Sequence, residues 1–482
     1  MDAKINNKTV ADNILWRFLE RIGAHAVTFV VSVVLARMLE PSMYGTIAIV
    51  MVFITILQVF IDGGLGNSLV QKKEADELDF STVFFFNLIL CIFLYLTLFL
   101  CAPIIAAFYG AYELVSYIRI LGVTIIVSGI KNIQQAYVSK HMLFKKFFVA
   151  TLIGTVGSGI VGICAAYNGY GVWALVLQYL SNVFIDTTVL WFTVKWRPRL
   201  VFSYERLKSL WNYGWKLFVS CFLDKIYLKM RSMIIGKVYS ARDLAFYDRG
   251  DLFPFVIVTN IDESIDSVLL PSMASVQDEV LKVKMMTKRA IKVSTYIMAP
   301  LMMGLIACST PLVRLLLTDK WLPCVFFLRV MSLTYMFYPI HTANLNALKA
   351  IGRTDVFLKL EIIKKIVGFI ILACTMFISL KIMVLSVIIA DVISQIINSW
   401  PNKRLLDYSY IEQIKDILPN IILACIMFVI VYPVSFLHMS DWVILAIQMM
   451  LGMLIYISGS LILKNDSFEY LLNIIKMYFE KN

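Results

Sequence analysis

Five long stretches of this sequence contain no Asp, Glu, Lys or Arg, and they constrain the fold more than any other feature. They are residues 80–112, 147–185, 293–313, 417–440 and 442–463. A helix needs about 20 apolar residues to cross a bilayer, so the second stretch is long enough for two crossings. We expect the turn Asn168-Gly169-Tyr170-Gly171 to divide it. The chain is therefore expected to cross a membrane many times.

The composition excludes several classes of soluble protein. Hydrophobic residues make up 60% of the 482 residues, charged residues make up 16%, and the mean hydropathy is +0.80. A soluble protein has about 45–50% apolar and about 25% charged residues. A cytosolic enzyme, a secreted disulfide scaffold and a nucleic-acid-binding module are excluded on this ground. The net charge of +12 is typical of basic cytoplasmic loops.

Hydropathy predicts an all-α integral membrane protein with about 14 transmembrane helices. With the N-terminus inside, the loops on the inner side hold 25 Lys and Arg residues and those on the outer side hold 5. This asymmetry predicts that both termini are cytoplasmic. The expected spans are 14–38, 44–70, 81–108, 113–138, 147–167, 171–194, 213–238, 243–270, 290–316, 323–348, 356–379, 382–399, 417–437 and 441–463.

The sequence matches itself at an offset of 200 to 210 residues, which indicates an internal repeat. Asp62 aligns with Asp262, Lys131 with His341, and Asp186 with Asp391. Chance similarity between apolar helices is the alternative. Each repeat holds six spans, so both enter the membrane in the same direction and form two parallel six-helix lobes. The expected domains are an N-terminal lobe (1–200), a C-terminal lobe (201–405), and two extra helices with a cytoplasmic tail (406–482).

Two short segments, Val201–Leu210 and Ser409–Leu418, mix Tyr, Leu or Ile, Lys and Glu. They are expected either as amphipathic helices on the cytoplasmic surface or as solvated loops.

The first span of each repeat carries a polar stripe on one helical face. Charges inside spans are costly and usually face protein or a water-filled cavity, so the stripes predict a cationic cavity that holds an anionic head group. Arg17 and Lys216 could instead be helix-end residues whose charge reaches the interface, and a lone His such as His341 could be a hydrogen-bonded packing residue. The stripes are Arg17, Arg21, His25, Thr28 and Ser32 in the first repeat and Lys216, Ser220, Asp224, Tyr227 and Arg231 in the second. The candidate residues for binding an anionic head group such as a diphosphate are Arg17, Arg21, His25, Lys131, Lys216, Arg231 and His341.

Acids inside spans are candidates for binding a coupling ion, H⁺ or Na⁺. We single out Asp62, Asp224 and Asp262, although each could also form a structural pair with a basic neighbour. No cofactor or metal is expected, because the four His residues are far apart and no CxxC occurs among the eight Cys residues. No GxxxxGK[ST] motif is present, so ATP hydrolysis by this chain is not expected.

Several stretches resemble the polysaccharide-export branch of the multidrug/oligosaccharidyl-lipid/polysaccharide (MOP) flippase superfamily, the Wzx-like O-antigen, capsule and teichuronic acid flippases. The likeness runs over most of the chain. The stretches are DGGLGNSLVQKKEADELDFSTVFFFNL (62–88), GYGVWALVLQ (169–178), YSARDLAFYDRGDLF (239–253), LLPSMASVQDE (269–279), PLVRLLLTDKWLP (311–323) and ALKAIGRTD (347–355).

This resemblance implies a V-shaped, two-lobed fold like that of the multidrug exporters of the superfamily. It also implies movement of a polyprenyl-diphosphate-linked oligosaccharide across the bacterial plasma (inner) membrane, driven by an ion gradient. Glycosyltransferases and a polysaccharide polymerase are the partners it implies. Two rival functions stay open: a multidrug or cation antiporter of the same superfamily, and a membrane polysaccharide polymerase or ligase. An enzyme is not expected, because the outer loops are only a few residues long.

Overall fold

The computed structural model describes residues 23, 26–62, 65–72 and 74–480, and no strand occurs among them. The side chain of Lys216 also lies outside the described part. The chain divides into two compact units, residues 1–245 and 246–482. The predicted domain boundaries at 200 and 405 follow the sequence repeat rather than packing, and they stay predictions.

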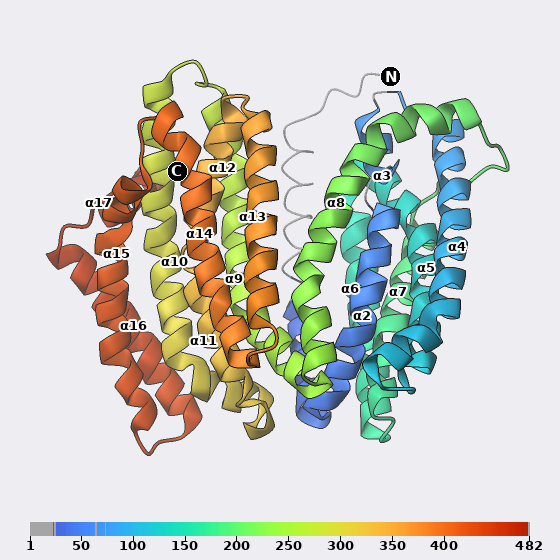
Figure 1. The fold of residues 1–482 in the computed structure, drawn as a ribbon, viewed down its shortest axis with the longest axis horizontal. Helices are drawn as coiled ribbons and strands as arrows, with labels where there is room; N and C mark the ends of the chain where they lie inside the picture. Colours follow the sequence, from blue (N-terminus) through green and yellow to red (C-terminus); the bar gives the residue numbers. More distant parts are fainter. Residues whose placement is uncertain (1–22, 24–25, 63–64, 73, 481–482) are drawn as a thin grey trace. The chain divides into compact units, whose positions relative to one another are not determined.

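Unit 1 contains a short apolar helix at Ala26–Met38 and then seven further helices in its described residues (Figure 1). They are α2 (Pro41–Asp62), α3 (Leu65–Gln71), α4 (Glu77–Tyr109), α5 (Leu114–Lys140), α6 (Phe144–Tyr167), α7 (Val172–Thr193) and α8 (Tyr204–Val238).

Unit 2 begins within α9 and holds the rest of the chain. Its helices are α9 (Ala241–Ala274), α10 (Val280–Leu317), η1 (Asp319–Trp321), α11 (Cys324–Tyr335), α12 (Tyr338–Ala350), α13 (Thr354–Thr375), α14 (Leu380–Leu405), α15 (Tyr410–Val431), η2 (Tyr432–Phe436), α16 (Asp441–Ile462) and α17 (Asp466–Glu480).

The helices confirm an all-α, multi-pass membrane protein. Ten segments of the described chain are long and apolar enough to cross a bilayer. The predicted spans at 213–238, 243–270 and 356–379 are also helical, as α8, α9 and α13, but they are not among these ten. Polar residues inside them, such as Asp224 and Arg231 in α8, lower their hydropathy. The predicted span 14–38 lies partly outside the described residues, so the count of 14 stays a prediction.

The turn that was expected to split the longest apolar stretch is present. Helix α6 ends at Tyr167 and α7 begins at Val172. Gly169 and Gly171 both have positive φ, 78° and 57°, a conformation that glycine adopts without a steric cost. Two helices can therefore follow one another within one charge-free run.

Four of the expected boundaries differ in the structure. The segments 201–210 and 409–418 are not separate surface helices, because Tyr204 begins α8 and Tyr410 begins α15, and each helix continues into the following span. Figure 1 shows α8 bending sharply after its first turns. The predicted span 44–70 is described as two helices, α2 and α3, and the span 323–348 is interrupted between α11 and α12.

Each unit has its own apolar packing. In unit 1, one cluster joins α3, α4, α5, α6 and α7 to the start of α8, and Phe80 and Ile133 are among its buried members. In unit 2, the two helices beyond the repeat, α15 and α16, pack on α10 through Met302, Met427 and Tyr456.

Candidate functional site

Unit 1 holds a polar cluster on three of its helices, in which Asp186 is buried, Lys131 is half-buried and Asp62 is exposed. Lys131 on α5 forms an ion pair with Asp186 on α7, and the two side chains are 21% and 8% exposed. The next residue on α5, Asn132, donates a hydrogen bond of 3.0 Å from Nδ2 to Oδ1 of Asp62 on α2. Helix α6 passes so close that a Cβ added to Gly154 would lie 2.9 Å from the Cβ of Asp186. The cluster thus ties α2, α5 and α7 together by charge and hydrogen bonds.

Unit 2 holds an equivalent cluster. His341 on α12 lies with Nε2 3.0 Å from Oδ1 of Asp391 on α14. The next residue, Thr342, donates a hydrogen bond to Oδ1 of Asp262 on α9. A further hydrogen bond of 2.7 Å joins Asn346 on α12 to Asp266 on α9.

The two clusters use the same positions of the sequence repeat. The alignment pairs Asp62 with Asp262, Lys131 with His341, and Asp186 with Asp391. In each unit the residue from the fourth span of the repeat contacts the acid from the sixth span, and its neighbour contacts the acid from the second. A charge inside a membrane is costly unless it is paired. In both repeats the acid of the sixth span is paired with the residue of the fourth span.

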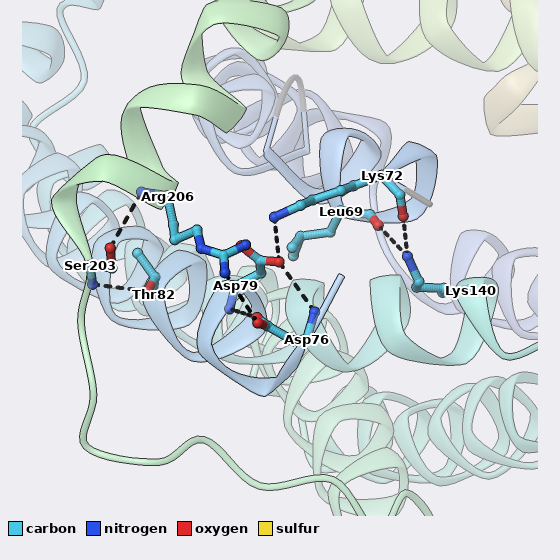
Figure 2. Close-up of polar contacts among 8 residues, drawn as sticks. All are labelled: Leu69, Lys72, Asp76, Asp79, Thr82, Lys140, Ser203 and Arg206. Carbon is cyan, nitrogen blue, oxygen red and sulfur yellow. Dashed lines mark hydrogen bonds and ion pairs between the residues drawn. The ribbon is translucent and has the colours of Figure 1, made fainter. Parts of the chain in front are cut away.

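Unit 1 also contains a third cluster, which centres on Asp79 in the first turn of α4 (Figure 2). The Asp79 side chain is fully buried, 2.6 Å from Nζ of Lys72 and 3.5 Å from Nη1 of Arg206 on α8. Asp79 and Asp76 also form a capping box, in which each side chain accepts the other's backbone N–H. Asp79 therefore fixes the start of α4, the end of the α3 segment and the start of α8.

Neighbouring contacts extend this cluster. Lys140 of α5 donates to the carbonyl oxygens of Leu69, at 3.2 Å, and Lys72. The backbone N–H of Ser203, before α8, donates to Thr82 Oγ1 at 3.1 Å. Figure 2 shows these contacts between residues of α3, α4, α5 and α8 and of the segments that flank them.

Asp76 lies outside the expected spans, and the pKa of its carboxyl is below the ordinary range of an aspartate. The backbone N–H of Asp79 is the main cause, with the Arg206 guanidinium and Lys72 adding to it, and together they lower the pKa of the Asp76 carboxyl. Because the pKa of Asp76 is lower in the folded state than in the unfolded chain, its ionised carboxylate stabilises the folded state when the pH is above the ordinary pKa of aspartate. This stabilisation is lost as the pH falls through the lowered pKa.

The remaining predicted site residues are distributed as follows. Arg17, Arg21 and His25 lie outside the described residues, as does the side chain of Lys216. Asp224 and Arg231 lie on α8 and are half-buried. The Nε of Arg231 is buried and has no hydrogen-bond partner among the residues that the structure describes.

The sequence analysis missed Asp79 and Asp186 as members of a site. Asp79 carries a local signal, because an acid three residues after Asp76 and directly before an apolar run is typical of a capping box. Asp186 was aligned with Asp391, but nothing local indicated that its partner is Lys131.

Comparisons with solved structures establish the fold. The structure titled "Lipid II flippase MurJ, inward closed conformation" superposes with a TM-score of 0.75, is 17% identical, and covers 94% of this chain and 99% of that chain. An inward-facing multidrug resistance MATE family transporter of the MOP superfamily gives a TM-score of 0.63 at 16% identity, covering 79% of this chain and 94% of that one.

Sequence comparisons give relatives in polysaccharide synthesis. The succinoglycan biosynthesis transport protein ExoT of Rhizobium meliloti is 24% identical over 67% of this chain and 65% of its own length. The teichuronic acid biosynthesis protein TuaB of Bacillus subtilis is 24% identical over 62% of each chain. The chain thus matches slightly less than two thirds of the length of these two relatives. Residues 34–326 match the family model described as "Polysaccharide biosynthesis protein". Since this match takes in more than half of the 482 residues, the chain belongs to the polysaccharide biosynthesis protein family.

Proposed function

We propose that this protein is a flippase, which moves a polyprenyl-diphosphate-linked oligosaccharide from the cytoplasmic to the outer leaflet by ion-coupled alternating access. The family match over residues 34–326 is the observation that carries the proposal. The relative named as a transport protein and the fold shared with a lipid II flippase support it. None of these names describes a polymerase or a ligase. We place the protein in the bacterial plasma membrane with both termini cytoplasmic, as the distribution of Lys and Arg predicts.

We propose that the diphosphate is held by basic side chains of the two stripes, Arg17, Arg21, His25, Lys216 and Arg231. The unpaired buried Nε of Arg231 supports this assignment, because a guanidinium with unused donors can bind phosphate oxygens. Lys131 and His341 each contact a carboxylate of their own unit. We therefore assign them a positioning role in place of direct contact with the head group.

The function is tested by extracting lipids from cells that lack the gene. Mass spectrometry should show accumulation of one polyprenyl-diphosphate-linked repeat unit, and the intact gene should remove it. Absence of any accumulation, with the downstream polymerase intact, would contradict flipping. Resistance to toxic cations conferred by the gene would instead favour the multidrug antiporter.

Replacing Arg231 with Gln is expected to reduce export of the polysaccharide at least tenfold while leaving the amount of folded protein unchanged. The change removes a charged donor for the diphosphate, and one charge-assisted hydrogen bond contributes about 1.5–3 kcal/mol. Export is measured as surface polysaccharide per cell. Lys208→Gln is the matched control, because Lys208 is an exposed cation on the same helix. Equal export by wild type and Arg231→Gln would remove Arg231 from the site.

A further inference from the structure

We propose that the imidazole of His341 is a binding site for a proton, and that the amide of Asn398 rotates to accept the second imidazole hydrogen when the proton binds. The coupling of this proton to transport rests on the proposed function. The proton site itself does not, because it follows from the hydrogen bonds of unit 2.

The hydrogen bonds of His341 define its neutral form. Nδ2 of Asn398, on α14, lies 2.8 Å from Nδ1 of His341. An amide nitrogen can only donate, so Nδ1 accepts and the ring hydrogen is on Nε2. That nitrogen donates to Oδ1 of Asp391 at 3.0 Å. Both ring nitrogens are thus satisfied while the imidazole is uncharged.

The same residues can also satisfy the hydrogen bonds of the protonated imidazole. A protonated imidazole donates from both nitrogens, and Nδ1 would then face the amide nitrogen of Asn398, also a donor. Oδ1 of Asn398 is buried and makes no hydrogen bond with the residues that the structure describes. Rotating the amide by about 180° exchanges its oxygen and nitrogen, so the unpaired oxygen becomes the acceptor for Nδ1–H. One amide atom is unpaired in either orientation, and the rotation sacrifices no hydrogen bond.

Asp391 is held in place to balance an imidazolium. Its second oxygen, Oδ2, accepts a hydrogen bond of 2.6 Å from Nε2 of Gln395. The amide oxygen of Gln395 in turn accepts from the hydroxyl of Tyr410 on α15 at 3.0 Å. The carboxylate therefore cannot turn away from His341 without breaking this chain of hydrogen bonds.

The ionisable groups around His341 are mostly acidic. Asp391 belongs to α14. The ring of Tyr338 on α12 lies 5.9 Å from the imidazole. Helix α10 packs against α12 with apolar side chains such as Ile291. The groups on the other packed elements are Asp262, Glu263 and Asp266 on α9, Glu361 with its ion-pair partner Lys364 on α13, and Tyr410 on α15. Carboxylates on two sides favour a cation at this position.

The repeat supplies an internal comparison. In unit 1 the equivalent position is Lys131, which forms an ion pair with Asp186. In unit 2 the same position holds the side chain whose unperturbed charge changes near neutral pH. The two units therefore share one ion-pair position, and in unit 2 this position is occupied by an imidazole.

The test observes the proton directly. The chain has only four His residues, so the full-length protein with ¹⁵N-labelled His, in lipid nanodiscs, gives few imidazole signals. His341→Gln identifies the signal, and His438→Gln is the control, because His438 is exposed. We expect the His341 signal to change from the Nε2–H form to the doubly protonated form between pH 9 and pH 5.

Two variants test the assigned partners. Asp391→Asn is expected to weaken proton affinity about tenfold, since it removes the balancing charge. Asn398→Asp is expected to strengthen it about tenfold, since it replaces the donor with a second acceptor. A signal that stays neutral down to pH 5, or a titration that neither variant moves, would overturn the proposal. If His341 titrates as expected and cells without the gene accumulate no lipid-linked sugar, the proton site stands and the proposed function fails.

Discussion

Replacing Asp79 with Asn is expected to lower the free energy of unfolding by about 3 kcal/mol, the loss that follows when one partner of a buried ion pair is removed. The Asp79 side chain is fully buried, with Lys72 at 2.6 Å and Arg206 at 3.5 Å. The variant leaves both cations without their shared carboxylate and weakens the capping box of α4. The measurement is thermal unfolding of the detergent-purified protein, with a midpoint lowered by roughly 3 °C.

Glu77→Gln is the matched control for Asp79→Asn. Glu77 lies in the same first turn of α4 and pairs with Arg199 at 2.8 Å, but both side chains are more than half exposed. Exposed ion pairs contribute about 0–1 kcal/mol, so the control should unfold close to wild type. Similar losses in the two variants would mean that burial of Asp79 does not determine the stability of this cluster.

Replacing Lys131 with Gln is expected to destabilise the protein by several kcal/mol and to abolish export. The change leaves the Asp186 carboxylate, which is only 8% exposed, without its cation. The double variant Lys131→Gln/Asp186→Asn removes both charges and keeps hydrogen-bonding groups of similar size. It is therefore expected to recover most of the lost stability, as measured by thermal unfolding.

Export by the double variant then separates two roles of Lys131. Recovery of both stability and export would mean that Lys131 acts by balancing Asp186. Recovery of stability without export would mean that the Lys131 charge itself serves the substrate. A single variant as stable as wild type would contradict the ion pair as a structural element of unit 1.

The sequence by itself determined the elements of this protein. The apolar runs, the turn at Gly169 and Gly171, and the helical class were all predictable, because a bilayer requires helices of a set length and turns require particular residues. The repeat also identified the positions of Lys131 and His341 as equivalent. Where helices begin was less predictable, as α8 and α15 show, because their amphipathic first turns continue directly into apolar spans.

Only the tertiary structure decided which buried charges are paired. Lys131 and Asp186 are 55 positions apart, and Asp79 and Arg206 are on different helices, so no local pattern relates them. The close approach of α6 and α7 at Gly154, which positions Asp186, likewise depends on packing. Helix formation follows from local hydropathy, whereas the partner of a buried charge depends on which helix faces are brought together. The sequence therefore showed where the polar residues of the spans lie, whereas their ion-pair and hydrogen-bond partners were known only from the tertiary structure.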